Sequence, residues 1–238
     1  MTGRIPFLGH GDDFPPTCQA LDEPNGLLAA GGELSQQMLL AAYSRGIFPW
    51  YEQPQPLLWW SPNPRAVMFP AELHISRSLR KVLRRNHFRL SVDTHFPDVM
   101  QACAEPRRDG LGTWIGTDML RAYTALHYRG LAHSVEVLEP DGELVGGLYG
   151  VALGRVFFGE SMFSRRTDAS KVAMVALVHI LLRGQFALID CQVDNPHLRS
   201  LGAREIDRLD FEALLAQNID FEMDPGIWSL PGTCGDLT

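Results

Sequence analysis

The pattern of apolar and polar residues divides the chain near residue 63. The first 65 residues contain more than half of the prolines and several turn signals, such as Pro24-Asn25-Gly26. Proline fixes the backbone and removes a donor, so short elements joined by turns are predicted there. One helix is expected, with Ser35 as N-cap and Gly46 as its stop. We therefore predict a small N-terminal domain, 1–62, and a larger domain, 63–238.

The larger domain has a more regular alternation of strand and helix patterns. Strands are predicted over 88–93, 133–139, 143–153, 156–163 and 186–193. Helices are predicted over 76–85 (N-cap Ser76), over 97–104, from Thr117 or Asp118 to Gly130, over 169–183 (N-cap Asp168), and after Asp210. This order predicts an α+β fold, with an antiparallel meander followed by a helix and a parallel strand. If the last two strands splay apart, they open a crevice.

Composition places the chain among ordinary globular proteins, with 45% hydrophobic and 21% charged residues. No apolar run approaches the roughly 20 residues that span a bilayer. The first residues lack a signal-peptide pattern, so a cytoplasmic protein is expected. The four cysteines, Cys18, Cys103, Cys191 and Cys234, are far apart, and we expect free thiols rather than zinc ligands.

The net charge of −7 argues against a generally sticky nucleic-acid binder. One segment differs, because residues 73–92 contain no acid. Its cations are Arg77, Arg80, Lys81, Arg84, Arg85 and Arg89. Such a basic helix face either binds phosphates locally or is simply a solvated surface.

Polar residues interrupt two predicted strands that should be buried. Glu160 comes two residues after the apolar run Val156–Phe158, and Asp190 and Gln192 lie in the last apolar strand. Because residues two apart on a strand share a face, Asp190 and Gln192 should point the same way, with Cys191 opposite. A buried polar group without a partner costs about 1–3 kcal/mol. These residues therefore mark either a functional site or a polar pair that ties down a loop.

Longer stretches of the chain resemble the bacterial leucyl/phenylalanyl-tRNA–protein transferase family. The matching stretches begin with Glu23-Pro-Asn-Gly-Leu-Leu-Ala, Gly31-Gly-Glu-Leu-Ser, Ala42-Tyr-Ser-Arg-Gly-Ile-Phe-Pro-Trp, Leu58-Trp-Trp-Ser-Pro-Asn-Pro-Arg and His74-Ile-Ser-Arg-Ser. They continue with Gly112-Thr-Trp-Ile, Ala132-His-Ser-Val-Glu-Val, Gly159-Glu-Ser-Met-Phe-Ser-Arg, Asp168-Ala-Ser-Lys, Ile189-Asp-Cys-Gln and Ser200-Leu-Gly-Ala. They occur in the family order between about residues 20 and 210, which makes the resemblance far more specific than one short motif.

The resemblance implies a reaction and its partners. Members transfer leucine or phenylalanine, less often methionine, from charged tRNA to proteins that begin with Arg or Lys, which marks them for N-end rule degradation. It implies a larger domain similar to the N-acetyltransferase (GNAT-like) superfamily. No metal or cofactor is expected, because the aminoacyl ester is already activated. We expect a monomer.

The resemblance also implies roles for individual residues. Asp190 and Gln192 would be catalytic, Glu160 would meet the cationic N-terminal residue of the acceptor or its ammonium, and Tyr43 would contact the acceptor peptide. The pocket for the transferred side chain would be formed by Met162, Leu148, Leu177, Leu181 and Ile189. Some members have Phe in place of Leu177 and Leu181 and Met in place of Leu148, so a wider pocket is expected here. By pattern alone, these apolar residues are core.

Two further groups would bind the tRNA. Trp50 and Trp114 match tryptophans that hold the terminal adenosine, by stacking worth about 1–3 kcal/mol per base; packing is the alternative. Arg77, Arg80, Lys81, Arg84 and Arg85 would contact the acceptor-stem backbone, which carries no direct sequence information.

Other functions remain open at this point. The chain could be a non-catalytic tRNA- or degron-binding relative. It could also be an acetyl-CoA-dependent N-acetyltransferase, although 164–169 has no glycine and ends near an acid, Asp168. A Cys191 nucleophile assisted by His197 is a further alternative.

Overall fold

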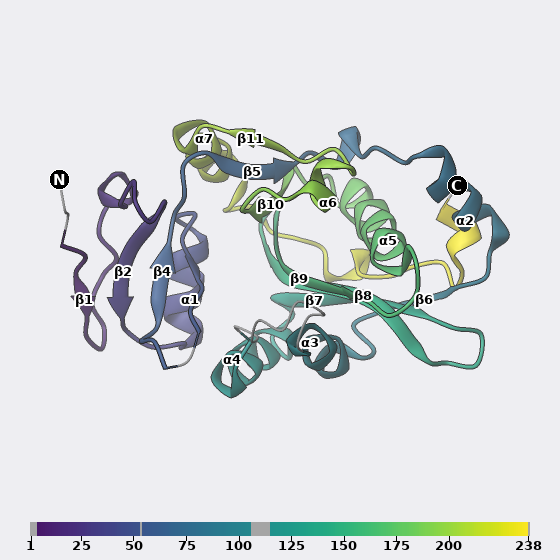
Figure 1. The fold of residues 1–238 in the computed structure, drawn as a ribbon, viewed down its shortest axis with the longest axis horizontal. Helices are drawn as coiled ribbons and strands as arrows, with labels where there is room; N and C mark the ends of the chain where they lie inside the picture. The colour runs from purple at the N-terminus through teal and green to yellow at the C-terminus, as the bar shows by residue number, and fades with distance from the viewer. Residues whose placement is uncertain (1–3, 53, 106–114, 238) are drawn as a thin grey trace.

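The computed structural model describes residues 4–52, 54–105 and 115–237, which form two sheets (Figure 1). The smaller sheet has the order β1-β2-β4-β3. Its strands are β1 (Phe7–Leu8), β2 (Leu27–Gly31), β3 (Phe48–Pro49) and β4 (Leu58–Trp60), and the helix α1 (Gln36–Tyr43) packs beside them. Only β1 and β2 pair in parallel in this sheet.

The larger sheet has the order β11-β5-β10-β9-β8-β7-β6. Its strands are β5 (Arg65–Met68), β6 (Arg89–Val92), β7 (Ala132–Leu138), β8 (Leu144–Leu153), β9 (Val156–Ser164), β10 (Leu188–Gln192) and β11 (Arg204–Ile206). All neighbours pair antiparallel except β9 and β10, which are parallel. The predicted meander, helix and parallel strand are therefore confirmed, and the fold is mixed α+β.

Helices cover both faces of the larger sheet (Figure 1). The α-helices are α2 (Arg77–Arg85), α3 (Phe96–Ala104), α4 (Thr117–His127), α5 (Ala169–Arg183), α6 (Pro196–Arg199) and α7 (Arg208–Asn218). Short 3-10 turns occupy Thr17–Gln19, Pro70–Glu72, Pro225–Ile227 and Cys234–Leu237. The apolar α5 lies on one face, and α3 and α4 lie on the other, so a core cluster forms on each side. No helix in the described part is both long and apolar enough to cross a membrane.

The two N-caps that were predicted to be serines are confirmed. The hydroxyls of Ser35 and Ser76 accept hydrogen bonds from the first turns of α1 and α2. The last helix is present as predicted, but its predicted N-cap was wrong, because Asp207 rather than Asp210 caps α7. At α4, Gly116 is the N-cap and makes no side-chain bond, so neither Thr117 nor Asp118 caps it. Asp168 is the N-cap residue of α5, as predicted, but its carboxylate pairs with Lys171 and makes no capping hydrogen bond.

The two parallel strands separate along their length. Pairing between β9 and β10 runs from Val156 opposite Leu188 to Phe158 opposite Asp190, and β9 then continues alone with β8 to Ser164. Irregular register occurs beside the point of separation in both β8–β9 and β10–β5. Because bulges bend strands and interrupt pairing, they account for the split.

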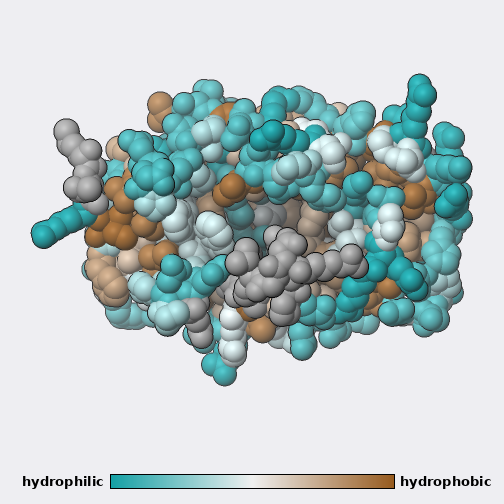
Figure 2. Space-filling view, viewed as in Figure 1, coloured by the Kyte–Doolittle hydropathy of each residue, from teal (hydrophilic) through white to brown (hydrophobic). Residues whose placement is uncertain are grey.

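Surface character differs between the two ends of the molecule. Figure 2 shows apolar residues gathered at the left end, over the smaller sheet, while hydrophilic residues cover most of the rest of this face. Phe7 of β1 is among the large hydrophobic side chains that are exposed. The end that carries α2 has a hydrophilic surface in the same view.

Gly46, just after α1, packs closely against Phe211 of α7. Replacing Gly46 with alanine should therefore destabilise the fold. Its φ is +71°, and an added Cβ would lie 2.6 Å from the Phe211 ring. Gly130 is a matched control, because it has a similar φ of +70° with nothing within 4 Å. We expect Gly46→Ala to lower the free energy of unfolding by at least about 1 kcal/mol more than Gly130→Ala, measured by urea denaturation. Equal losses would mean that only backbone strain matters at Gly46.

Candidate active site

Glu160 is placed by a bulge in β9. Ser161 pairs with Tyr149 and Gly159 pairs with Gly150, so Glu160 is an extra residue without a partner across β8. A bulge redirects the side chain of the extra residue. Gly150 permits this arrangement, since a Cβ there would lie 2.2 Å from the Phe158 carbonyl oxygen. Residues with a side chain at position 150 would therefore disturb the bulge.

Four elements converge on the Glu160 carboxylate. The Tyr43 hydroxyl of α1 donates to Oε1 at 2.6 Å, and Gln192 Nε2 of β10 donates to the same oxygen at 3.1 Å. The Tyr123 hydroxyl of α4 donates to Oε2 at 3.2 Å. The two tyrosine oxygens also lie in close contact with each other. Each phenol has a single hydrogen, so when both donate to an ionised Glu160 neither can donate to the other. The site is thus built by β9 and β10 of the larger sheet and by α1 and α4, not by one element.

Burial sets the ionisation of this cluster. It raises the pKa of Glu160 to about 7; the charge of Asp190 acts in the same direction, while the bonds from the two tyrosines and Gln192 oppose it. Burial, with the nearby Glu160 charge, also raises the pKa of Tyr43 and that of Tyr123 well above 10.0. Both phenols therefore stay protonated and keep donating at neutral pH.

Asp190 is tied to a buried arginine. Arg65 donates Nε to Oδ1 at 2.8 Å and Nη2 to Oδ2 at 2.7 Å, and neither side chain is exposed. The guanidinium lies over the rings of Phe48 and Phe211, at 4.9 and 4.6 Å from their centroids. Such a bidentate pair combines the attraction between opposite charges with two parallel hydrogen bonds of fixed geometry. Both carboxylate oxygens of Asp190 are consequently occupied within the protein.

The expected regular alternation from Asp190 to Gln192 is lost. The register shifts between them, and Gln192 has a φ of +63° in the left-handed region. The Gln192 backbone N–H donates to Asp190 Oδ1 at 2.9 Å, which holds this unusual conformation. Gln192 then reaches Glu160, while Asp190 faces Arg65. Cys191 points into the other core cluster, as predicted.

Arg65 and Tyr123 belong to this network but were not predicted from the sequence. The signal for Arg65 was a cation directly before the apolar run Ala66–Met68, where a buried strand rarely holds a charge. Tyr123 lies within the helix predicted from Thr117 or Asp118 to Gly130, but nothing in the local pattern indicates that its hydroxyl meets residue 160.

The residues assigned to the amino-acid pocket lie together on the α5 side of the sheet. Leu148, Leu177, Leu181 and Ile189 are all buried in the same core cluster. Met162 is half-buried, packs against this cluster and pairs with Leu148 across the strands. Met162 is therefore the member nearest to solvent.

The tRNA-binding candidates differ in what the structure describes. Trp50 is 43% exposed, and its ring lies 5.6 Å from that of Trp60, whose Nε1 donates to the Trp50 carbonyl. Trp114 lies outside the described residues. In α2, Leu79 and Leu83 face the core, whereas its five cations, Arg77, Arg80, Lys81, Arg84 and Arg85, are exposed. Among the described residues, no acid forms an ion pair with these five.

The thiol alternative has the wrong environment. Cys191 is buried, and burial raises the pKa of its thiol far above the ordinary range. A thiolate nucleophile needs the opposite shift. The proposed partner, His197, has a pKa lowered chiefly by burial, and the charges that act on it are those of Lys171 and Asp168. Cys191 is thus a core residue. Within the described ranges, no cluster of three or more His, Cys, Asp or Glu residues could hold a metal ion.

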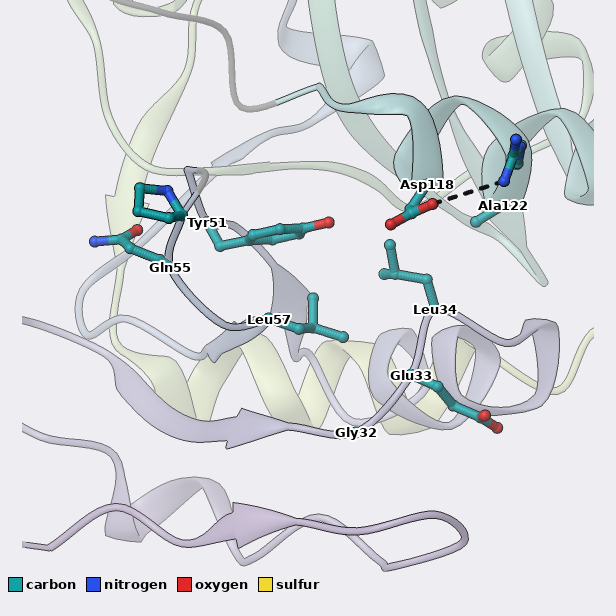
Figure 3. Close-up of a pocket in the computed structure, with 10 residues that line it drawn as sticks. Gly32, Glu33, Leu34, Tyr51, Gln55, Leu57, Asp118 and Ala122 are labelled. Atoms are coloured by element: carbon teal, nitrogen blue, oxygen red, sulfur yellow. Dashed lines mark ion pairs between the residues drawn. The ribbon is translucent and has the colours of Figure 1, made fainter.

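A cavity of about 750 Å³ opens beside this network, between the smaller sheet and α4 (Figure 3). Tyr51 and Leu34 point into it, and Asp118 lies at its α4 side, paired with Arg121. Ala122 also lines it and precedes Tyr123 in the helix. None of the predicted site residues lines this cavity, so the sequence analysis gave no indication of it.

Comparison with known proteins identifies the family. The model described as leucyl/phenylalanyl-tRNA protein transferase matches residues 67–216, and that of its N-terminal domain matches residues 32–63. A leucyl/phenylalanyl-tRNA–protein transferase of Aromatoleum aromaticum is 60% identical over 94% of each chain. A protein of the same name from Nitrosomonas eutropha is 61% identical over 87% of this chain and 88% of its own.

These matches define the protein as a transferase. More specifically, the chain belongs to the leucyl/phenylalanyl-tRNA–protein transferase family. Among solved structures, L-PGS from Bacillus licheniformis is similar with a TM-score of 0.40 and 11% identity, over 74% of this chain and 56% of that one. A TM-score this low does not establish a shared fold.

The Arg65–Asp190 pair should dominate the local stability. Replacing Arg65 with Met leaves a buried carboxylate without its cation, so we expect a loss of about 3–5 kcal/mol in the free energy of unfolding. The exposed Arg204–Glu72 pair is the control, and Arg204→Met should cost under about 1 kcal/mol. Urea denaturation measures both. In the double variant Arg65→Met/Asp190→Leu, much of the loss should be recovered; similar losses for Arg65→Met and Arg204→Met would contradict this account.

Proposed function

We propose that this protein transfers leucine or phenylalanine, less often methionine, from aminoacyl-tRNA to the α-amine of proteins that begin with Arg or Lys, and so marks them for N-end rule degradation. Family membership supports the reaction. The observation that carries the assignment of the site is the half-buried Glu160, held by Tyr43, Tyr123 and Gln192 where β9 and β10 separate. A carboxylate held by neutral polar donors is suited to an incoming amine.

The reaction is aminolysis of an activated ester, so positioning does most of the work. Holding both substrates in reacting geometry contributes about 7–11 kcal/mol. Gln192 uses its side-chain N–H toward Glu160, which leaves its carbonyl oxygen as an acceptor for the attacking amine. Asp190 acts at the same centre as a positioning residue, because it fixes the Gln192 backbone while Arg65 occupies its oxygens.

The transferred side chain would enter beside Met162, the half-buried member of the apolar set. The inner walls of this pocket would be formed by Leu148, Leu177, Leu181 and Ile189. These side chains are packed in the core, so they would have to change rotamer to admit the substrate. Methionine adapts readily to side chains of different shape, which suits both Leu and Phe. Tyr43 would contact the acceptor, and Trp50 with Trp114 would hold the terminal adenosine by stacking.

The exposed cations of α2 would bind the acceptor-stem backbone. They are free of acidic partners in the described part of the chain, so their charge is available to phosphates. In Figure 1, α1 and α2 lie toward opposite ends of the molecule, so a bound stem would extend along the larger sheet. We further propose a domain boundary near Asn63, a GNAT-like larger domain, a monomeric state and a cytoplasmic location.

The transfer reaction is tested directly with Leu-tRNA labelled in its leucine. A peptide beginning with Arg should acquire label without added ATP or acetyl-CoA, whereas the same peptide beginning with Ala should not. Asp190→Asn should lower the turnover by at least about tenfold without a matching loss of tRNA affinity, because the positioned centre is disturbed. No label on either peptide while tRNA still binds would favour a non-catalytic tRNA- or degron-binding protein. Transfer only from acetyl-CoA would instead indicate an N-acetyltransferase.

Charge reversal in α2 should weaken tRNA binding. Arg80→Glu and Arg84→Glu, singly and together, remove phosphate contacts, so the plot of log affinity against log salt should become less steep by about 0.7–0.9 per lost contact. Filter binding at several salt concentrations measures this slope. Arg129→Glu is the control, since Arg129 is also exposed but lies at the end of α4. An unchanged slope in the double variant would rule out α2 as the backbone contact.

A further inference from the structure

Two carboxylates face the point where β9 and β10 separate, and they differ in the charge of the groups that donate to them. Asp190 Oδ1 accepts from Arg65 Nε and from the Gln192 backbone, and Oδ2 accepts from Arg65 Nη2. Its side chain is not exposed. Protonation of Asp190 would displace the guanidinium and leave a buried cation unpaired, which is strongly unfavourable. Asp190 is therefore a poor proton acceptor.

Glu160 has a different set of neighbours. Its Oε1 accepts from Tyr43 and Gln192, and its Oε2 accepts only from Tyr123. An ionised carboxylate offers about four acceptor positions, so one position on Oε2 is left for an incoming donor. All three neighbours are neutral donors rather than cations. The residue as a whole is half-buried, whereas the Asp190 side chain is not exposed.

From this geometry we infer that Glu160 takes the first proton from the α-ammonium of the acceptor protein, an inference that rests on the proposed function. The single remaining position on Oε2 fits one N–H of an ammonium. It does not fit a guanidinium side chain, which binds a carboxylate best through two parallel bonds. Glu160 thus acts on the reacting amine and does not read the side chain of the N-terminal Arg.

The proton balance of the step is complete without a co-reactant. The ammonium has three hydrogens, and one passes to Glu160 Oε2, which leaves a neutral amine. Its nitrogen lone pair attacks the ester carbonyl carbon; the C–N bond forms and the bond from that carbon to the ribose oxygen breaks. The second hydrogen goes to the leaving ribose oxygen, and the third remains on the new amide. Glu160 releases its proton to water before the next cycle.

The ionisation of the groups around Glu160 matches this role. The groups that face it are Tyr43 from α1, Tyr123 from α4, Tyr149 from β8, and Asp190 and Gln192 from β10. Burial raises the pKa of each tyrosine well above 10.0, so none of them ionises near neutrality. The pKa of Glu160 is raised to about 7. An α-amine titrates at about 7.7–8.0, so the proton moves between nearly matched groups.

The test is the pH dependence of kcat/KM for Glu160→Gln, with Leu-tRNA and a peptide beginning with Arg. Wild-type kcat/KM should rise with pH up to about 7, where Glu160 becomes ionised, and then level off. The variant can use only acceptor that is already neutral, so its rate should keep rising about tenfold per pH unit until about pH 8. The defect should be about 100-fold or more near pH 7 and should shrink as the pH increases.

A second acceptor separates this role from recognition of the side chain. Citrulline has the shape of Arg without its charge. If Glu160 takes the proton, Glu160→Gln should leave the preference for Arg over citrulline unchanged. Loss of that preference, or a defect of constant size above pH 7, would overturn the inference.

Glu136→Gln is the matched control. Glu136 is also a carboxylate buried in the larger sheet with a pKa raised by burial, but its donors are Ser91 and Ser134 and it lies outside the site. It should keep the wild-type pH profile. If Glu160→Gln does not fold, Tyr123→Phe retains the carboxylate and removes the bond that lowers its pKa, so the bend in the profile should move to higher pH.

The failures of the two hypotheses are distinct. If the wild-type protein transfers no leucine at pH 8, the proposed function fails. If the wild-type protein transfers leucine, but Glu160→Gln has the wild-type bend near pH 7 and Tyr123→Phe does not move it, only the role of Glu160 fails.

Discussion

The buried pair of Arg65 and Asp190 is the constraint on which the rest of the site depends. A charge removed from water must keep its partner, so β5 and β10 are held together at this point of the sheet. The guanidinium also lies between Phe48 of the smaller sheet and Phe211 of α7. One interaction therefore fixes the larger sheet, the smaller sheet and the last α-helix relative to one another.

The same pair shapes the end of β10. Because Asp190 is held by Arg65, its Oδ1 can also anchor the Gln192 backbone, which then adopts a left-handed conformation. The strand stops pairing with β9, and Gln192 turns toward Glu160. A buried ion pair is weak evidence for stability alone, but here it specifies one backbone path. In the proposed transferase, Asp190 thus contributes geometry and leaves the chemistry to its neighbours.

Separation of roles between the two carboxylates follows from their partners. Asp190 faces a cation, whereas Glu160 faces two phenols and an amide, and burial raises the pKa of Glu160 to about 7. Two carboxylates on neighbouring strands can therefore have different chemical roles. This arrangement needs residues from α1, α4, β9 and β10, so α1, which packs beside the smaller sheet, is part of the site.

The sequence by itself determined the local structure and the family. Apolar periodicity located the strands and long helices, and Ser35 and Ser76 located two helix starts, because these signals act within a few residues. The caps at Asp207 and Gly116 were missed, since several polar residues near each start compete and packing selects one. Asp190, Gln192 and Glu160 were recognisable as polar residues in apolar strands. Only the tertiary structure decided that Arg65 occupies Asp190, that a bulge turns Glu160 toward Tyr43 and Tyr123, and that Gln192 joins them, because these contacts link residues 32 to 125 positions apart and depend on how the two sheets pack.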